Sequence, residues 1–102
     1  DLLRAENYAR RAEEFAIAGN AQRALAEIYI RLAQITRLRG EENGIGFLEK
    51  SIELSRAHAY PLAQARALQE YAVLRDAMGD SEAARTLREE AAAIIEALAR
   101  DS

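Results

Sequence analysis

The sequence predicts an all-α fold of five helices, and three observations indicate it. First, 23 Ala and 12 Leu stand against eight Ile, two Thr and one Val in 102 residues. This ratio favours helix because β-branched side chains lose rotamer freedom on coiling. Second, apolar residues recur at steps of three and four along nearly the whole chain. Third, five Gly and one Pro are too few to punctuate an all-β chain but enough to mark helix ends.

Each expected helix carries an apolar stripe, which places the members of the stripe on one side of the helix. In chain order the stripes are Ala5, Tyr8, Ala12 and Phe15; Leu25, Ile28, Leu32 and Ile35; Ile45, Leu48 and Ile52; Leu68, Tyr71, Leu74 and Met78; and Ala84, Leu87, Ala91, Ile94 and Leu98. Gly19, Gly40 and Gly79 follow the first, second and fourth stripes, where glycine commonly ends a helix. Because every link is short, successive helices should lie antiparallel.

Polar residues and one proline mark three of the expected helix starts. Asn20 is expected to cap the second helix, and Asp80 or Ser81 the fifth, because their side chains accept hydrogen bonds from first-turn N–H groups. Pro61 suits the first turn of the fourth helix, where its missing N–H costs nothing.

An internal repeat organises these helices. At a shift of 39 residues the pairs that superpose are Ala24 with Ala63, Ala26 with Ala65, Ala33 with Ala72 and Gly40 with Gly79. The last helix matches best one residue later. The chain is therefore interpreted as a single domain over 1–102, with an orphan second helix at 1–19 and repeats at 20–58 and 61–99. A single helical hairpin cannot bury both of its faces, so such repeats are expected to stack.

The repeat resembles a known family on a definite set of residues. These are Tyr29, Leu32, Ala33 and Gly40; Leu68, Tyr71, Ala72 and Gly79; and Asp80, Ala84, Leu87 and Ala91. They resemble the tetratricopeptide repeat (TPR), especially long-period repeats of bacterial regulatory proteins. The resemblance implies a TPR-like α-solenoid, a right-handed stack of antiparallel helical hairpins. The period of 39–40 residues exceeds the usual length of about 34, and the family's proline at the end of the second helix is missing.

The composition argues against several classes of partner. No disulfide or Cys-based metal site can form, because the sequence contains no Cys, and this also fits a cytoplasmic setting. A net charge of −3, with acidic residues interleaved among the arginines, argues against a nucleic-acid contact. No apolar run approaches the roughly 20 residues of a membrane span. We therefore expect neither a nucleic-acid partner nor a membrane segment.

No residue pattern predicts catalysis. His58 is the sole histidine and lies at an expected helix end, so a solvated residue is favoured over a metal ligand. Glu doublets occur at 13–14, 41–42 and 89–90. The two side chains of each doublet point about 100° apart on a helix, which is typical of exposed faces and not of a carboxylate pair that shares one site. Phosphate-loop, nucleophile-elbow and zinc patterns do not occur. We expect a protein that is not an enzyme and that binds no metal or cofactor.

The resemblance implies a concave groove that receives a peptide or a helix. By position its residues are Glu27, Ile30, Gln34, Arg37 and Leu38 in the first repeat and Arg66, Gln69, Val73 and Asp76 in the second. Ile30 and Val73 would be apolar anchors, and Arg37 and Arg66 would bind carboxylates, so that replacing both by Glu weakens binding without unfolding the domain. The alternative is that Ile30 and Val73 pack beneath neighbouring helices.

The ends of the predicted stack leave apolar side chains without a neighbour. They are Leu2, Leu3, Tyr8 and Phe15 on the orphan helix and Ile94 and Ile95 on the last. Either the chain, which begins at Asp1 rather than Met, is a piece of a longer array, or it self-associates through these residues.

The predicted function is non-catalytic protein–protein binding within a larger cytoplasmic bacterial regulatory or scaffold protein. A structural self-association module is the alternative, and a designed repeat chain without a partner is a further one.

Overall fold

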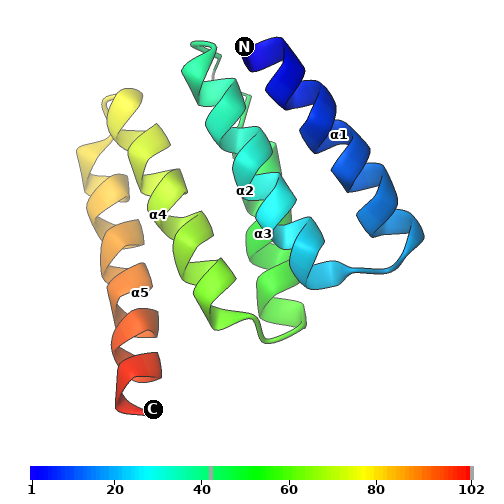
Figure 1. The fold of residues 1–102 in the computed structure, drawn as a ribbon. Helices are drawn as coiled ribbons and strands as arrows, with labels where there is room; N and C mark the ends of the chain where they lie inside the picture. Colours follow the sequence, from blue (N-terminus) through cyan, green and yellow to red (C-terminus); the bar gives the residue numbers. More distant parts are fainter. Residues whose placement is uncertain (42, 102) are drawn as a thin grey trace.

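The computed structural model describes residues 1–41 and 43–101, which form five α-helices (Figure 1). They are α1 (Leu2–Ala18), α2 (Gln22–Leu38), α3 (Ile45–Ala57), α4 (Pro61–Ala77) and α5 (Ser81–Arg100). No strand occurs among these residues, so the predicted all-α fold with five helices is confirmed over the described chain. Within the described ranges, no helix has the length and apolar character that a membrane-spanning segment requires.

The helices stack as antiparallel hairpins. Figure 1 shows α2 and α4 side by side, with α3 behind them, α1 next to α2, and α5 next to α4. α3 packs its backbone against both α2 and α4, and it therefore joins the hairpin α2–α3 to the hairpin α4–α5. Among the described helices, α1 brings its backbone close only to α2, and α5 only to α4. The two outer helices are thus covered on one side, as at the ends of a helical repeat stack.

Each of the four turns contains one described residue in the left-handed region. Gly40 and Gly79 take it after α2 and α4, with φ of +77° and +83°. Asn20 and Ala59 take it after α1 and α3, with φ of +55° and +56°. Glycine adopts this conformation without steric cost, whereas the Cβ of alanine is crowded there, so the turn at Ala59 stores strain.

Asn20 does not cap α2, and this prediction was wrong. Because the backbone of Asn20 is left-handed, the N-cap position falls on Ala21, and the Asn20 carboxamide oxygen accepts from Gln22 Nε2 at 2.5 Å. Asp80 does cap α5, since its Oδ1 accepts from the backbone N–H of Ala83 at 3.1 Å.

Small residues occupy the tightest contacts between helices. Ala33, Ser51, Ala72 and Ala91, at the packing positions that the repeat predicts, are at most 3% exposed. The Ser51 Oγ donates to the carbonyl oxygen of Ala26 at 2.8 Å, so one buried hydroxyl ties α3 to α2. Short side chains at these positions let the backbones approach, and larger residues fill the layers between them.

The buried side of α1 differs from the predicted stripe. Ala9 and Ala16 are buried, whereas Tyr8 and Phe15 are 70% and 79% exposed. α1 has a helix on one side only, so the small residues that face α2 are covered and the rings beside them are not. Phe47, the counterpart of Tyr8 one repeat later, is partly buried because α3 has helices on two sides.

Candidate interaction surface

One side of the α2 and α4 pair is open to solvent and holds most of the predicted groove residues. We call it the α2/α4 face; its at least partly exposed members are Glu27, Arg31, Gln34 and Leu38 on α2 and Leu62, Arg66, Gln69, Val73 and Asp76 on α4. Steps of three and four place each set on one side of its helix. The opposite sides of both helices are buried. Because α2 packs against α4 and Glu27 pairs with Arg66 across them, the two stripes form one continuous surface. Leu62, which is 58% exposed, extends the predicted groove towards the start of α4.

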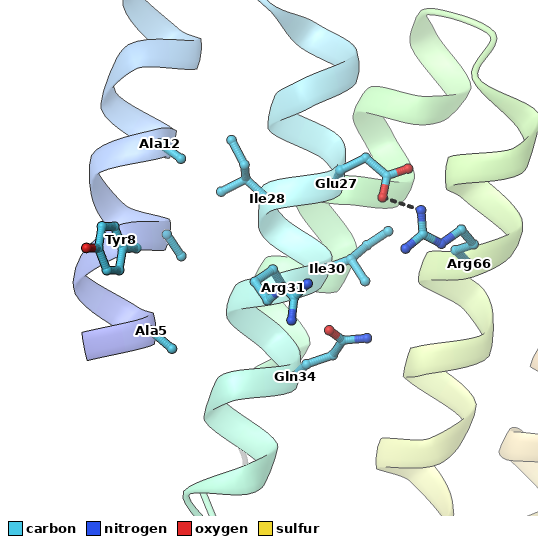
Figure 2. Close-up of a pocket in the computed structure, with 10 residues that line it drawn as sticks. Ala5, Tyr8, Ala12, Glu27, Ile28, Ile30, Arg31, Gln34 and Arg66 are labelled. Carbon is cyan, nitrogen blue, oxygen red and sulfur yellow. Dashed lines mark hydrogen bonds and ion pairs between the residues drawn. The ribbon is translucent and has the colours of Figure 1, made fainter. Parts of the chain in front are cut away.

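A first depression of about 480 Å³ lies between α1 and α2 (Figure 2). Its lining residues are Ala5, Tyr8, Ala9 and Ala12 of α1, Glu27, Ile28, Ile30, Arg31 and Gln34 of α2, and Arg66 of α4. Ile30 is only 3% exposed and packs in one cluster with Leu68, so the prediction of an open anchor at Ile30 was wrong. Its side chain lies on the part of α2 that faces α4, which covers it.

A second depression of about 540 Å³ lies between α4 and α5. It is lined by Gln69 and Val73 of α4 and by Arg88, Ala92, Ile95, Glu96 and Ala99 of α5. Val73 and Ile95 are each 40% exposed, so apolar surface is open here. Arg66, Gln69 and Val73 lie on the same stripe of α4, and they connect the two depressions along the α2/α4 face.

The first predicted carboxylate-binding arginine already has a partner within the chain. Arg66 Nη1 lies 2.5 Å from Glu27 Oε2, and the two side chains are 51% and 37% exposed. Figure 2 shows this ion pair bridging α4 and α2 beside the first depression. Such an exposed pair is weak, because water competes for both charges.

The second predicted arginine is held more tightly, by a carboxylate that the sequence analysis did not identify. Arg37 Nε donates to Glu70 Oε2 at 2.8 Å, and Gln34 Nε2 donates to Glu70 Oε1 at 3.3 Å. The Glu70 side chain is only 9% exposed. The cluster of Gln34, Arg37 and Glu70 therefore joins α2 to α4 beneath the α2/α4 face. Glu70 could have been noticed in the sequence as the one charged residue on the otherwise apolar buried side of α4. Its partner Arg37 could not, because it lies 33 residues away.

The remaining predicted residues lie in different surroundings. Asp76 forms an ion pair with Arg88 of α5, at the edge of the second depression. Leu38 is 62% exposed at the end of α2 and lines neither depression.

The residues predicted to form exposed stack ends differ in how far they are exposed. Ile94 is half-buried and packs against the cluster that contains Ala91, so the prediction that it widens an exposed edge was wrong. Ile95 beside it is 40% exposed and does widen that edge. Leu2 and Leu3 are 36% and 61% exposed on α1.

Outside this surface, His58 and Tyr29 lie in surroundings that indicate a role in the fold. His58 is the exposed C-cap residue of α3, with its ring stacked 5.9 Å from that of Tyr60, so a solvated helix end is confirmed. Burial, and secondarily the Glu13 carboxylate, raise the pKa of Tyr29 above its ordinary value. The described residues contain no group of three or more His, Cys, Asp or Glu that could hold a metal ion. Glu42, of the doublet at 41–42, lies outside the described residues.

Comparison of the chain with family models, with curated proteins and with solved structures finds no match.

Proposed function

We propose that the chain is a non-catalytic protein-interaction module whose α2/α4 face receives an extended or helical segment of another protein. The observation that carries the proposal is a pair of depressions along one stripe of α4, in which Arg66 lines the first depression and Gln69 and Val73 line the second. Each depression combines apolar walls with a polar edge, which suits a segment with two apolar anchors and polar residues between them.

The charges on this face favour a partner that is not strongly acidic. Arg37, Arg66 and Arg88 are each paired with a carboxylate of the chain, so a partner's carboxylates would have to displace Glu70, Glu27 or Asp76. Arg31, in the first depression, has no ion pair among the described residues and could receive a single carboxylate. The large apolar side chains that remain open are those of Tyr8, Val73 and Ile95 at the two depressions and those of Leu38 and Leu62 near the ends of the face. We therefore expect affinity to come mainly from burial of apolar side chains.

The described residues that line the two depressions include no Ser, Thr, Cys, His or Lys; the groups there that could act as acid, base or nucleophile are Tyr8 and Glu27 in the first and Glu96 in the second, and Glu27 is already paired with Arg66. This supports binding without catalysis. The resemblance to long-period repeats supports the wider part of the proposal, a TPR-type module within a larger cytoplasmic bacterial regulatory or scaffold protein.

A random peptide library displayed on phage tests the proposal without a known partner. Peptides selected on the wild-type chain are measured by fluorescence anisotropy against Val73→Asp, which puts a charge into the second depression. Binding should weaken by about tenfold or more, because one anchor site loses its apolar surface. Circular dichroism checks that each variant keeps its helices.

Ile17→Asp is the matched control, since Ile17 is 57% exposed on α1 and lines neither depression. Peptides that bind wild type and Val73→Asp equally well, or that lose affinity equally with Ile17→Asp, would contradict the proposal. So would a library that yields no binder at micromolar protein concentration.

A further inference from the structure

Two of the six aromatic rings in the chain differ from the other four. The rings of Phe47, Tyr60, Tyr29 and Tyr71 each have a cationic side chain within 5.1–5.5 Å of the centroid. The other two rings, those of Tyr8 and Phe15, have no cation over them among the described residues. They are also the two most exposed of the large apolar side chains, at 70% and 79%.

Two arginines alternate with these rings on the same side of α1. Arg4, Tyr8, Arg11 and Phe15 follow one another at steps of four, three and four, which is the spacing of a coiled-coil seam. We call these four residues the α1 seam. Neither Arg4 nor Arg11 makes an ion pair within the described chain, in contrast to Arg10, which pairs with Glu13. The α1 seam thus presents uncovered rings and unpaired cations in alternation.

We infer that the α1 seam is a self-complementary interface through which two copies of the chain pair, with their α1 helices antiparallel. In the register that overlaps the two helices along their full length, Tyr8 lies opposite Arg11 of the second copy and Phe15 opposite Arg4. The two-fold axis repeats both contacts in reverse, so all four rings gain a cation. In the same register Glu14, which also has no ion pair in the described chain, lies beside Arg4 of the second copy.

A second copy fits the α1 seam better than other occupants. An acidic partner would pair the arginines but leave the rings uncovered, and an apolar partner would cover the rings but desolvate the arginines. The seam itself carries both halves of the contact, as an isologous interface requires. Access is open, because α2 is the only described helix whose backbone packs against α1, it covers the side that holds Ala9 and Ala16, and the four seam residues are exposed. The inference does not depend on the proposed function of the α2/α4 face.

Sedimentation equilibrium across the micromolar to millimolar range tests the inference on the whole chain. The wild type should dimerise reversibly, and Phe15→Ala should raise the dissociation constant by about tenfold, because each dimer loses two ring contacts. Ile17→Ala is the matched control: Ile17 is 57% exposed on the other side of α1 and should leave the dissociation constant unchanged. Tyr8 is left intact because it also lines the first depression.

A charge exchange tests the register. Arg4→Glu sets the new carboxylate against that of Glu14 in the second copy, and Glu14→Arg sets the new guanidinium against that of Arg4. Each variant alone should therefore dimerise about tenfold more weakly than wild type. An equimolar mixture restores opposite charges at both contacts and should form a heterodimer about tenfold more tightly than either variant pairs with itself. Heterodimer formation also shows that both variants are folded.

Three results would overturn the inference. The first is a wild type that stays monomeric throughout the concentration range. The second is a dimer that Ile17→Ala weakens as much as Phe15→Ala does, or a mixture of the charge variants that fails to associate. The third is a monomer that binds vesicles of phosphatidylserine and phosphatidylcholine and loses this binding with Phe15→Ala, since the seam would then be a membrane-surface contact.

Discussion

Replacing Arg37 by Met removes the guanidinium that neutralises Glu70 but keeps an apolar stem of similar length. The Glu70 side chain is 9% exposed, and Arg37 is the cation that it contacts, at 2.8 Å. Loss of one partner of a fully buried pair costs about 3–5 kcal/mol. Because one third of the Arg37 side chain is exposed, water reaches the site, and we expect a loss of about 2 kcal/mol in the free energy of unfolding.

Urea unfolding followed by circular dichroism measures this loss, and a double-mutant cycle isolates the pair. Glu70→Met leaves the partly exposed Arg37 to be solvated, so it should cost about 1 kcal/mol or less. The double variant should cost less than the sum of the single variants, with a coupling energy of about 1–2 kcal/mol. The Arg37→Met change also corresponds to a melting temperature about 10 °C lower for a domain of this size.

The exposed pair of Arg66 and Glu27 is the matched control, since it also joins α2 to α4 but has side chains that are 51% and 37% exposed. Its coupling energy should be about 0.5 kcal/mol or less. Equal coupling in the two pairs, or coupling below about 0.5 kcal/mol at Arg37 and Glu70, would refute the reasoning that burial sets the difference. Arg37→Glu should destabilise more than Arg37→Met, contrary to the expectation from sequence that this exchange leaves the fold intact, because two carboxylates then meet.

Two further predictions concern single residues. Ala59→Gly should raise the free energy of unfolding by about 0.5–1 kcal/mol, because glycine relieves the crowded Cβ at φ +56°. Ala93→Gly, at an exposed position in the interior of α5, should lower it by a similar amount, and thermal unfolding compares the two. Burial raises the pKa of Tyr29, so the folded state holds the phenol proton to a higher pH than the unfolded state. The resulting stability is complete below about pH 10 and is lost as pH rises through the folded pKa. Urea unfolding at about pH 9 and about pH 11 should therefore show a smaller alkaline loss in Tyr29→Phe than in wild type, and equal losses would contradict the assignment.

Local chemistry was sufficient to predict the helices and most of their ends. Gly40 and Gly79 end α2 and α4 in the left-handed conformation, Pro61 begins α4, and Asp80 caps α5. Each of these features depends on residues within one helical turn, so it can be predicted from neighbouring residues in the sequence. Asn20 is the exception, because the same residue type suits a helix cap and a left-handed turn, and neighbouring residues do not distinguish the two.

Which side of each helix is covered was decided only by the tertiary structure. The spacing on α1 allowed either Tyr8 and Phe15 or Ala9 and Ala16 to face the core, and the presence of a single neighbouring helix selected the alanines. Ile30 became buried because α4 lies against that side of α2. The candidate surface differs most from its prediction, since its ion pairs join different helices through residues 12 to 39 positions apart. Composition and periodicity act within one helix, whereas burial and ion pairing depend on which helix lies alongside it.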